Sequence, residues 1–149
     1  MSVKPEDTLA HIMTRKVVTI SPSEKISDAL ALMADRDIGS LVVTQKDSAV
    51  GIITERDVIR RMVNDKDFGK FEVGSVMSHP LITTQPDTPS WEALRTMLVK
   101  RIRRIPILEN GKLVGIVTER DLFRWVLLVA YEPKLPEDIK DIVEKGYPR

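Results

Sequence analysis

Hydrophobic and polar positions follow two periods along this chain, and the two periods recur in the same order in each half. Short β-branched runs predict strands, whereas apolar residues spaced i, i+3, i+4 and i+7 predict helices with one apolar face. The first half therefore reads strand, helix, strand, strand, helix. Its predicted elements are strands at 17–20, 41–44 and 50–53, a helix with the apolar face Ile26, Ala29, Leu30 and Met33, and a helix that starts at Thr54.

The second half repeats this order. Asn110-Gly111 lies between two of its predicted strands, and Asn-Gly tolerates the positive φ angles that a tight hairpin requires. The predicted elements are strands at 81–84, 105–108 and 113–117, a helix at 89–100, and a last helix that starts at Thr118.

The two halves also match residue by residue, which indicates an internal duplication. Residues 13–63 align with 77–127 without a gap, and 15 of the 51 aligned positions are identical, against roughly three or four for unrelated sequences. We expect an α/β fold of the α+β type. Two tandem β-α-β-β-α repeats would pack about a pseudo-twofold axis with their sheets facing each other, which creates two related clefts.

The repeats are flanked by shorter segments. A short helix is expected around 6–12, and a second from Pro136 to Gly146, with Ile139, Ile142 and Val143 as its apolar stripe. The predicted segments are a lead-in helix (1–12), repeat 1 (13–63), a polar linker (64–76), repeat 2 (77–130) and a C-terminal tail (131–149).

The helix that starts at Thr118 is unusually apolar. Phe123 and the run from Trp125 to Val129 leave it almost no polar side, and such a helix must be covered all round. A subunit partner is favoured over a purely intrachain cover, so a homodimer is expected.

Composition narrows the function classes. The formal net charge of +1 argues against nucleic acid or anionic lipid as a partner. The absence of cysteine excludes disulfides and thiolate metal sites, and His11 and His79 lack ligand-like spacing, so structural loop positions are expected for both. No apolar run is long enough to span a bilayer and no secretory signal is present, so a cytoplasmic location is expected.

The tetrapeptide Thr-Glu-Arg-Asp follows a predicted strand in both halves, at 54–57 and 118–121. Taken alone, each copy is best interpreted as a helix cap, in which Thr accepts a backbone hydrogen bond and Asp complements the helix dipole. Three features favour a ligand site: the full tetrapeptide occurs twice, a glycine (Gly51, Gly115) precedes each copy and leaves room for close approach, and a helix N-terminus suits anions.

Ribose chemistry gives a reason for the aspartate. A short carboxylate can accept hydrogen bonds from both cis hydroxyls of a ribose, and the neighbouring threonine can serve a sugar or phosphate oxygen. Arg101, Arg103 and Arg104 precede the strand at 105–108. They are either a solvated face or a phosphate clamp, and the clamp is slightly favoured.

Over about residues 7–130 the sequence resembles a pair of CBS domains, the Bateman module. The residues that carry the resemblance are Met77-Ser78, Thr83, Pro86-Asp87-Thr88, Glu92-Ala93, Met97, Arg104 to Ile107 and Gly111 to Asp121. Paired CBS domains commonly bind AMP, ADP or ATP, and sometimes S-adenosylmethionine or NAD, in the clefts between repeats.

The resemblance implies a set of ligand-binding residues. Asp57 and Asp121 would hold ribose, and Thr54 and Thr118 ribose or phosphate. The remaining members are Thr19 and Thr83 with the backbone of Val18 and Ile82 beside the adenine, Arg103 and Arg104 at the phosphate, and Arg56 and Arg120 of the tetrapeptides. Repeat 1 departs from this pattern, because Gly39 and Ser40 occupy the places of Arg103 and Arg104, so one strong and one weaker or empty site is expected.

The resulting hypothesis is a non-catalytic sensor that binds an adenine nucleotide, requires no metal, and acts on an unidentified protein partner. The alternatives are a structural scaffold whose clefts stay empty, or a binder of another adenosyl ligand such as S-adenosylmethionine or NAD. An enzyme is the weakest alternative, because the sequence lacks a cysteine, a histidine–carboxylate constellation and a glycine-rich phosphate loop.

Overall fold

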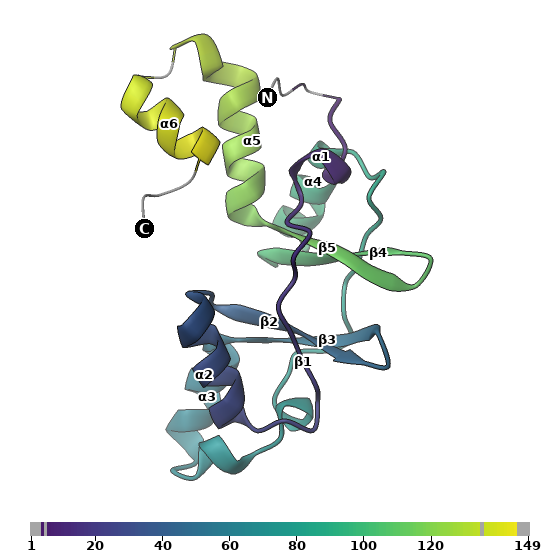
Figure 1. The fold of residues 1–149 in the computed structure, drawn as a ribbon, viewed down its shortest axis with the longest axis vertical. Helices are drawn as coiled ribbons and strands as arrows, with labels where there is room; N and C mark the ends of the chain where they lie inside the picture. The colour runs from purple at the N-terminus through teal and green to yellow at the C-terminus, as the bar shows by residue number, and fades with distance from the viewer. Residues whose placement is uncertain (1–3, 5, 135, 146–149) are drawn as a thin grey trace. The chain divides into compact units, whose positions relative to one another are not determined.

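A computed structural model describes residue 4 and residues 6–134 and 136–145 of the chain (Figure 1). It confirms the predicted mixture of helices and two sheets. The α-helices are α1 (Leu9–Ile12), α2 (Ile26–Arg36), α3 (Glu55–Asn64), α4 (Ser90–Lys100), α5 (Glu119–Tyr131) and α6 (Glu137–Lys145). The 3-10 helices are η1 (Phe68–Lys70), η2 (Val73–Ser75) and η3 (Glu132–Lys134). The strands are β1 (Thr19–Ile20), β2 (Ser40–Gln45), β3 (Ser48–Thr54), β4 (Arg104–Glu109) and β5 (Lys112–Thr118).

The chain forms two compact units, and each unit draws on separate stretches of sequence. Unit 1 is built from 1–15, 84–107 and 115–149, and unit 2 from 16–83 and 108–114. The segment before repeat 1 therefore lies in unit 1, which holds the helices of repeat 2. The segment before repeat 2 lies in unit 2, which holds the helices of repeat 1. The boundaries predicted from the sequence remain predictions.

Unit 2 contains the three-stranded sheet, in the order β1-β2-β3. β1 pairs parallel with β2 and β2 pairs antiparallel with β3, so that Val42 lies opposite both Thr19 and Ile52. Figure 1 shows α2 and α3 against this sheet. The shared core is apolar and fully or nearly fully buried; its members are Ile20, Ile26, Ala29, Met33, Leu41, Val43, Ile53, Val58 and Val73.

The two lead-in segments, 7–14 and 71–78, make equivalent backbone contacts at positions 64 residues apart. Ser90 N donates to Asp7 O in unit 1 at 2.9 Å, as Ile26 N donates to Phe71 O in unit 2 at 2.9 Å. The isolated bridge between Thr14 and Ile116 likewise matches that between Ser78 and Ile52. The duplication therefore extends upstream of Met13 to residue 7, where little sequence identity remains.

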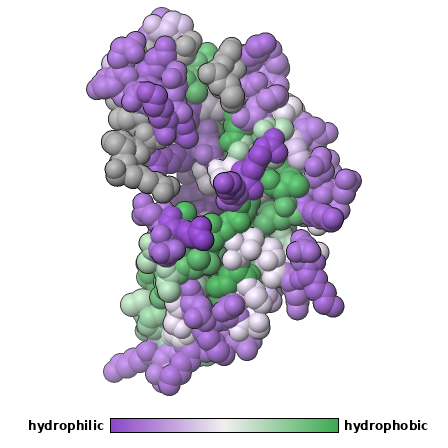
Figure 2. All heavy atoms as spheres, viewed as in Figure 1, coloured by the Kyte–Doolittle hydropathy of each residue, from purple (hydrophilic) through white to green (hydrophobic). Residues whose placement is uncertain are grey.

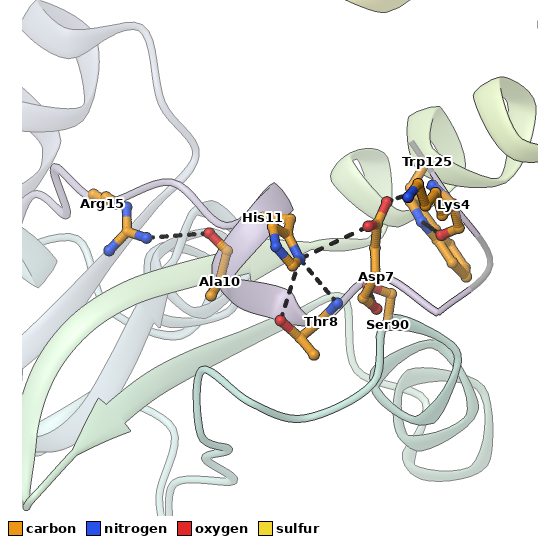
Figure 3. Close-up of polar contacts among 8 residues, drawn as sticks. All are labelled: Lys4, Asp7, Thr8, Ala10, His11, Arg15, Ser90 and Trp125. Carbon is orange, nitrogen blue, oxygen red and sulfur yellow. Dashed lines mark hydrogen bonds and ion pairs between the residues drawn. The ribbon is translucent and has the colours of Figure 1, made fainter. Parts of the chain in front are cut away.

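Side chains fix the first lead-in segment to unit 1 (Figure 3). The indole Nε1 of Trp125 donates to Lys4 O at 3.1 Å, and the buried Ser90 Oγ donates to Asp7 O at 2.7 Å. His11 lies in α1, not in a loop as predicted, and its Nδ1 accepts from Thr8 N at 3.2 Å. This histidine has a structural role at the start of a helix.

The strand predicted at 81–84 is wrong in extent. Only Thr84 pairs there, through a parallel bridge with Ile107 in which Thr84 N donates to Pro106 O at 3.1 Å. Pro106 has no N–H to donate in return, so the ladder cannot continue upstream. In unit 2 the residue equivalent to Pro106 is Val42, whose N–H donates to Val18 O, and β1 forms.

Other predicted elements shift at their ends. The strand expected at 17–20 shortens to Thr19–Ile20, the lead-in helix to Leu9–Ile12, and the predicted linker contains η1 and η2. α6 begins at Glu137, one residue after the predicted Pro136. The side chains of its predicted stripe, Ile139, Ile142 and Val143, and the predicted end at Gly146, lie outside the described residues.

The apolar helix α5 is covered on one side by its own chain. Leu122 and Trp125 are buried, whereas Phe123 keeps 61% of its surface exposed. α6 lies beside α5 in unit 1, as Figure 1 shows. Intrachain packing thus accounts for part of the apolar character, and the homodimer remains a prediction.

Candidate ligand-binding site

Each Thr-Glu-Arg-Asp sequence forms a complete capping box at the start of a helix. At α3, Thr54 N donates to Asp57 Oδ2 at 2.9 Å and Asp57 N donates to Thr54 Oγ1 at 3.3 Å. The same two bonds between Thr118 and Asp121 at α5 measure 2.9 and 3.2 Å. In both boxes the threonine hydroxyl also donates to the aspartate Oδ2. The capping interpretation is therefore correct, and it fixes both carboxylates in the same geometry.

The second carboxylate oxygen differs between the two boxes. Asp57 Oδ1 accepts from Ser78 Oγ at 3.1 Å. For Asp121 Oδ1, the described part of the chain provides no hydrogen bond. A ligand hydroxyl would find a free acceptor on Asp121, whereas at Asp57 it would share Oδ1 with a hydroxyl that can rotate away.

The glycine that precedes each box is required for packing within the chain. An added Cβ at Gly51 would lie 2.5 Å from Met77 Sδ, and one at Gly115 would lie 2.6 Å from Met13 Sδ. A backbone carbonyl oxygen, of Ser78 or Thr14, would lie 3.1 Å away in each case. The group that approaches closely is therefore the Met-Ser or Met-Thr lead-in, and no ligand is needed to explain these glycines.

The predicted site residues divide between the two units. Thr19 and Thr83 are exposed, Val18 and Ile82 are half-buried, and Val18 O already accepts from Val42 N. Unit 2 holds Thr54, Asp57, Arg56, Thr19, Val18, Thr83 and Ile82, and unit 1 holds Thr118, Asp121, Arg120, Arg103 and Arg104.

The predicted phosphate-binding arginines lie at the entry to β4. Arg103 Nε lies 3.6 Å from Glu119 Oε2, its side chain is 71% exposed, and its carbonyl accepts from Glu119 N at 2.8 Å. Arg104 is half-buried as the first residue of β4. In unit 2 the Glu55 carboxyl group lies over Gly39, the residue equivalent to Arg103, so only unit 1 presents a cation at this place.

The sequence interpretation missed a groove beside Asp57. Its volume is about 310 Å³, and its wall comes from α3 and from the end of the second lead-in segment. The only sequence signal for it is the pair Arg60-Arg61, whose second member has no basic counterpart in repeat 2. The groove is lined by Asp57, Arg60, Arg61, Asn64, Ser75 and Val76.

Neither a metal-binding cluster nor a membrane-spanning helix occurs in the described part of the chain. It contains no group of three histidine, cysteine, aspartate or glutamate side chains arranged to hold a metal ion. None of its helices combines the length and the apolar character that crossing a bilayer requires.

Comparison with known proteins identifies the class to which the fold and the two boxes belong. The CBS domain model matches the chain twice, at residues 2–64 and 73–128. The chain belongs to the CBS-domain family and carries two CBS domains in tandem.

Three similar proteins illustrate the match. The uncharacterized protein MK0525 of Methanopyrus kandleri is 37% identical over 141 residues, which cover 93% of this chain and 69% of that protein. The uncharacterized protein MJ1404 of Methanocaldococcus jannaschii is 30% identical over 165 residues, 96% of this chain but only 39% of that protein. The crystal structure of CBSX2 in complex with AMP is 27% identical, with a TM-score of 0.73, and covers 81% of this chain and 98% of that one.

Proposed function

We propose that this tandem CBS protein is a regulatory module that binds an adenosine nucleotide, AMP, ADP or ATP, through Asp57 and Asp121. The observation that carries the proposal is the pair of matching capping boxes, which hold two carboxylates in one geometry. The similarity to CBSX2, whose structure contains AMP, supports the adenosine class.

The capping box prepares each aspartate for this role. Because Oδ2 accepts the threonine N–H and hydroxyl, the carboxylate cannot rotate, and Oδ1 is oriented before a ligand arrives. A ribose presents two adjacent hydroxyl donors, which suit a carboxylate acceptor. In each repeat the threonine of the box, Thr54 or Thr118, is proposed to lie beside the ribose that its aspartate holds. The residues proposed to flank the adenine are Thr19, Thr83, Val18 and Ile82. Those proposed to supply positive charge for phosphate are Arg56, Arg120, Arg103 and Arg104.

A regulatory role without catalysis fits these side chains. The chain has no cysteine, and its two histidines lie far apart in sequence, so a cysteine nucleophile and a histidine pair are missing. The effect of the ligand would pass to a regulated protein, in the cytoplasm, without a metal cofactor.

A homodimer is the proposed assembly. Three helices keep large apolar side chains exposed. Figure 2 shows that hydrophobic residues also reach the surface on the face drawn. Burying such side chains against a second copy would remove them from water. The exposed residues are Ile59, Met62 and Val63 on α3, Trp91, Leu98 and Val99 on α4, and Phe123 and Tyr131 on α5. The mass of the chain in solution, measured by light scattering, tests this assembly.

Ligand titration tests the function. AMP, ADP and ATP are added to the chain, and the unfolding temperature and heat of binding are measured. Ligand at 100 times its dissociation constant should stabilise the fold by about 2.7 kcal/mol. S-adenosylmethionine and NAD are the comparison ligands, and a shift with either one alone would change the ligand but retain the adenosyl class.

A structural scaffold is the second candidate function, and one observation favours it. Both capping boxes are complete without a ligand, so helix initiation alone would explain the repeated tetrapeptide. A chain that binds none of these adenosine compounds would be a scaffold.

A further inference from the structure

The groove beside Asp57 presents positive charge that the chain does not neutralise. The Arg61 guanidinium carbon lies 4.0 Å from the centroid of the Phe71 ring, and Arg61 Nε is buried with no hydrogen-bond partner. Arg60 is exposed on the preceding position of α3. Buried donors are nearly always satisfied in proteins, so an unpaired guanidinium nitrogen beside a groove calls for an acceptor.

The equivalent surface of unit 1 is filled by the chain itself. Trp125 takes the place of Arg61, is only 6% exposed, and donates to Lys4 O. Leu128 takes the place of Asn64. Arg124, equivalent to Arg60, donates from Nη2 to Glu144 O at the end of α6, at 3.1 Å. The carbonyl end of a helix carries partial negative charge, so this arginine already contacts a partially negative acceptor.

We propose that the groove of unit 2 binds the 5′-phosphate of the nucleotide whose ribose Asp57 holds, with Arg60 and Arg61 as its cationic ligands. This inference rests on the proposed function, because Asp57 is both the ribose acceptor and one wall of the groove.

The chemistry of the lining suits a phosphate. A guanidinium that stacks on an aromatic ring keeps its edge donors for a planar pair of oxygens, and two arginines in one groove can bind separate oxygens of one phosphate. Asn64 and Ser75 also line the groove, but the Asn64 amide already donates to Arg60 O at 3.0 Å and the Ser75 hydroxyl to Glu72 O at 2.7 Å, so the arginines carry the binding; Val76 closes the wall with an apolar side chain. With two arginines and one aspartate, the lining carries a formal net charge of +1, so a phosphate would be favoured over an uncharged 5′-substituent.

The test compares AMP with adenosine on the full chain by calorimetry. An Asp121→Ala background removes the other ribose acceptor, so that the measured site is the one at Asp57. We expect AMP to bind about tenfold or more tightly than adenosine, the effect of at least one charge-assisted hydrogen bond. Arg60→Gln together with Arg61→Gln should abolish this preference and change adenosine affinity by less than about twofold.

A charge-matched control separates groove contacts from general electrostatics. Arg95→Gln with Lys100→Gln removes the same two charges from exposed positions of α4 and should leave the AMP preference intact. A melting curve checks the fold of each variant, and Arg60→Gln alone serves if the double variant unfolds.

The outcomes distinguish the groove from the proposed function. Adenosine binding that persists with an AMP preference unchanged in the Arg60 and Arg61 variants would overturn the groove and retain the nucleoside site. Equal affinity of the parent chain for AMP and adenosine would likewise overturn the groove and retain the nucleoside site. A chain that binds neither compound would overturn the proposed function and the groove with it.

Discussion

The helices α3 and α5 begin with the same four residues and then diverge. Both start at a Thr–Asp capping box, and the matching hydrogen bonds in the two boxes agree to within about 0.1 Å. One turn later, α3 presents Arg61 beside an open groove, whereas α5 presents Trp125 beneath the N-terminal segment. The capping box fixes the backbone at the start of each helix, and the side chains of the following turns can differ between the two helices. One copy can therefore keep an open surface while the other becomes part of the core.

The largest expected effect tests this divergence. Trp125→Ala should cost about 3–5 kcal/mol, because it removes a buried aromatic ring and leaves a cavity. Arg61→Ala, at the equivalent position, should cost only about 1 kcal/mol, since the lost interaction is a stacked guanidinium near the surface. Urea unfolding monitored by circular dichroism gives both values. Similar losses in the two variants would mean that the two helices are not differentiated as described.

A second pair of variants tests what the repeats share. Gly51→Ala and Gly115→Ala should each destabilise by about 1–3 kcal/mol, because the new Cβ would overlap Met77 or Met13 and approach a backbone carbonyl. Gly69→Ala is the control, since its Cβ would find Ser27 at an ordinary 3.7 Å. Thermal unfolding of the three proteins compares them. If only one of the first two variants were destabilised, the lead-in segments would not be equivalent.

The aspartates separate capping from ligand binding. Asp121→Ala should cost about 1 kcal/mol through loss of the cap and should abolish nucleotide binding at that repeat. Asp57→Ala should act in the same way in the first repeat, where it also removes the acceptor for Ser78 Oγ. Calorimetry gives the number of AMP sites in each variant. Unchanged stoichiometry in both would rule out the ribose role.

The smallest effect on stability is expected at Arg103 and Arg104, at the entry to β4. Arg103→Gln with Arg104→Gln should change the unfolding free energy by less than about 1 kcal/mol, because the Arg103–Glu119 pair is exposed. The same variant should weaken ATP and AMP far more than adenosine. Titration of the three compounds measures this difference, and equal weakening would point to a change in the fold.

The sequence predicted those parts of the molecule that depend on local patterns. Apolar spacing predicted α2 and α4, Asn110-Gly111 predicted the second hairpin, and Thr-x-x-Asp predicted both helix caps. These features require only contacts between residues close in sequence. That the chain binds an adenosine compound, and which compound it binds, stays a prediction.

Features that depend on distant neighbours were missed. Pro106 limits the pairing of the segment at 81–84 because it has no N–H to donate, and no residue within that segment indicates this. Asp7 and Phe71 are dissimilar residues, so the sequence does not indicate that they are equivalent. Their equivalence follows only from the structure, in which the backbone carbonyl of each accepts a hydrogen bond from the first residue of a helix. The groove was missed for the same reason, because Ser75 and Val76 join Arg60 and Arg61 only after the lead-in segment folds back onto α3.

A crystal structure of the chain grown with AMP tests the account most directly. The account predicts ribose hydroxyls within hydrogen-bonding distance of the Asp57 or Asp121 carboxylate and, for a nucleotide at Asp57, a phosphate in contact with Arg60 and Arg61. Crystals in which AMP is absent, or is bound away from both aspartates while each keeps its hydrogen bonds within the chain, would contradict it.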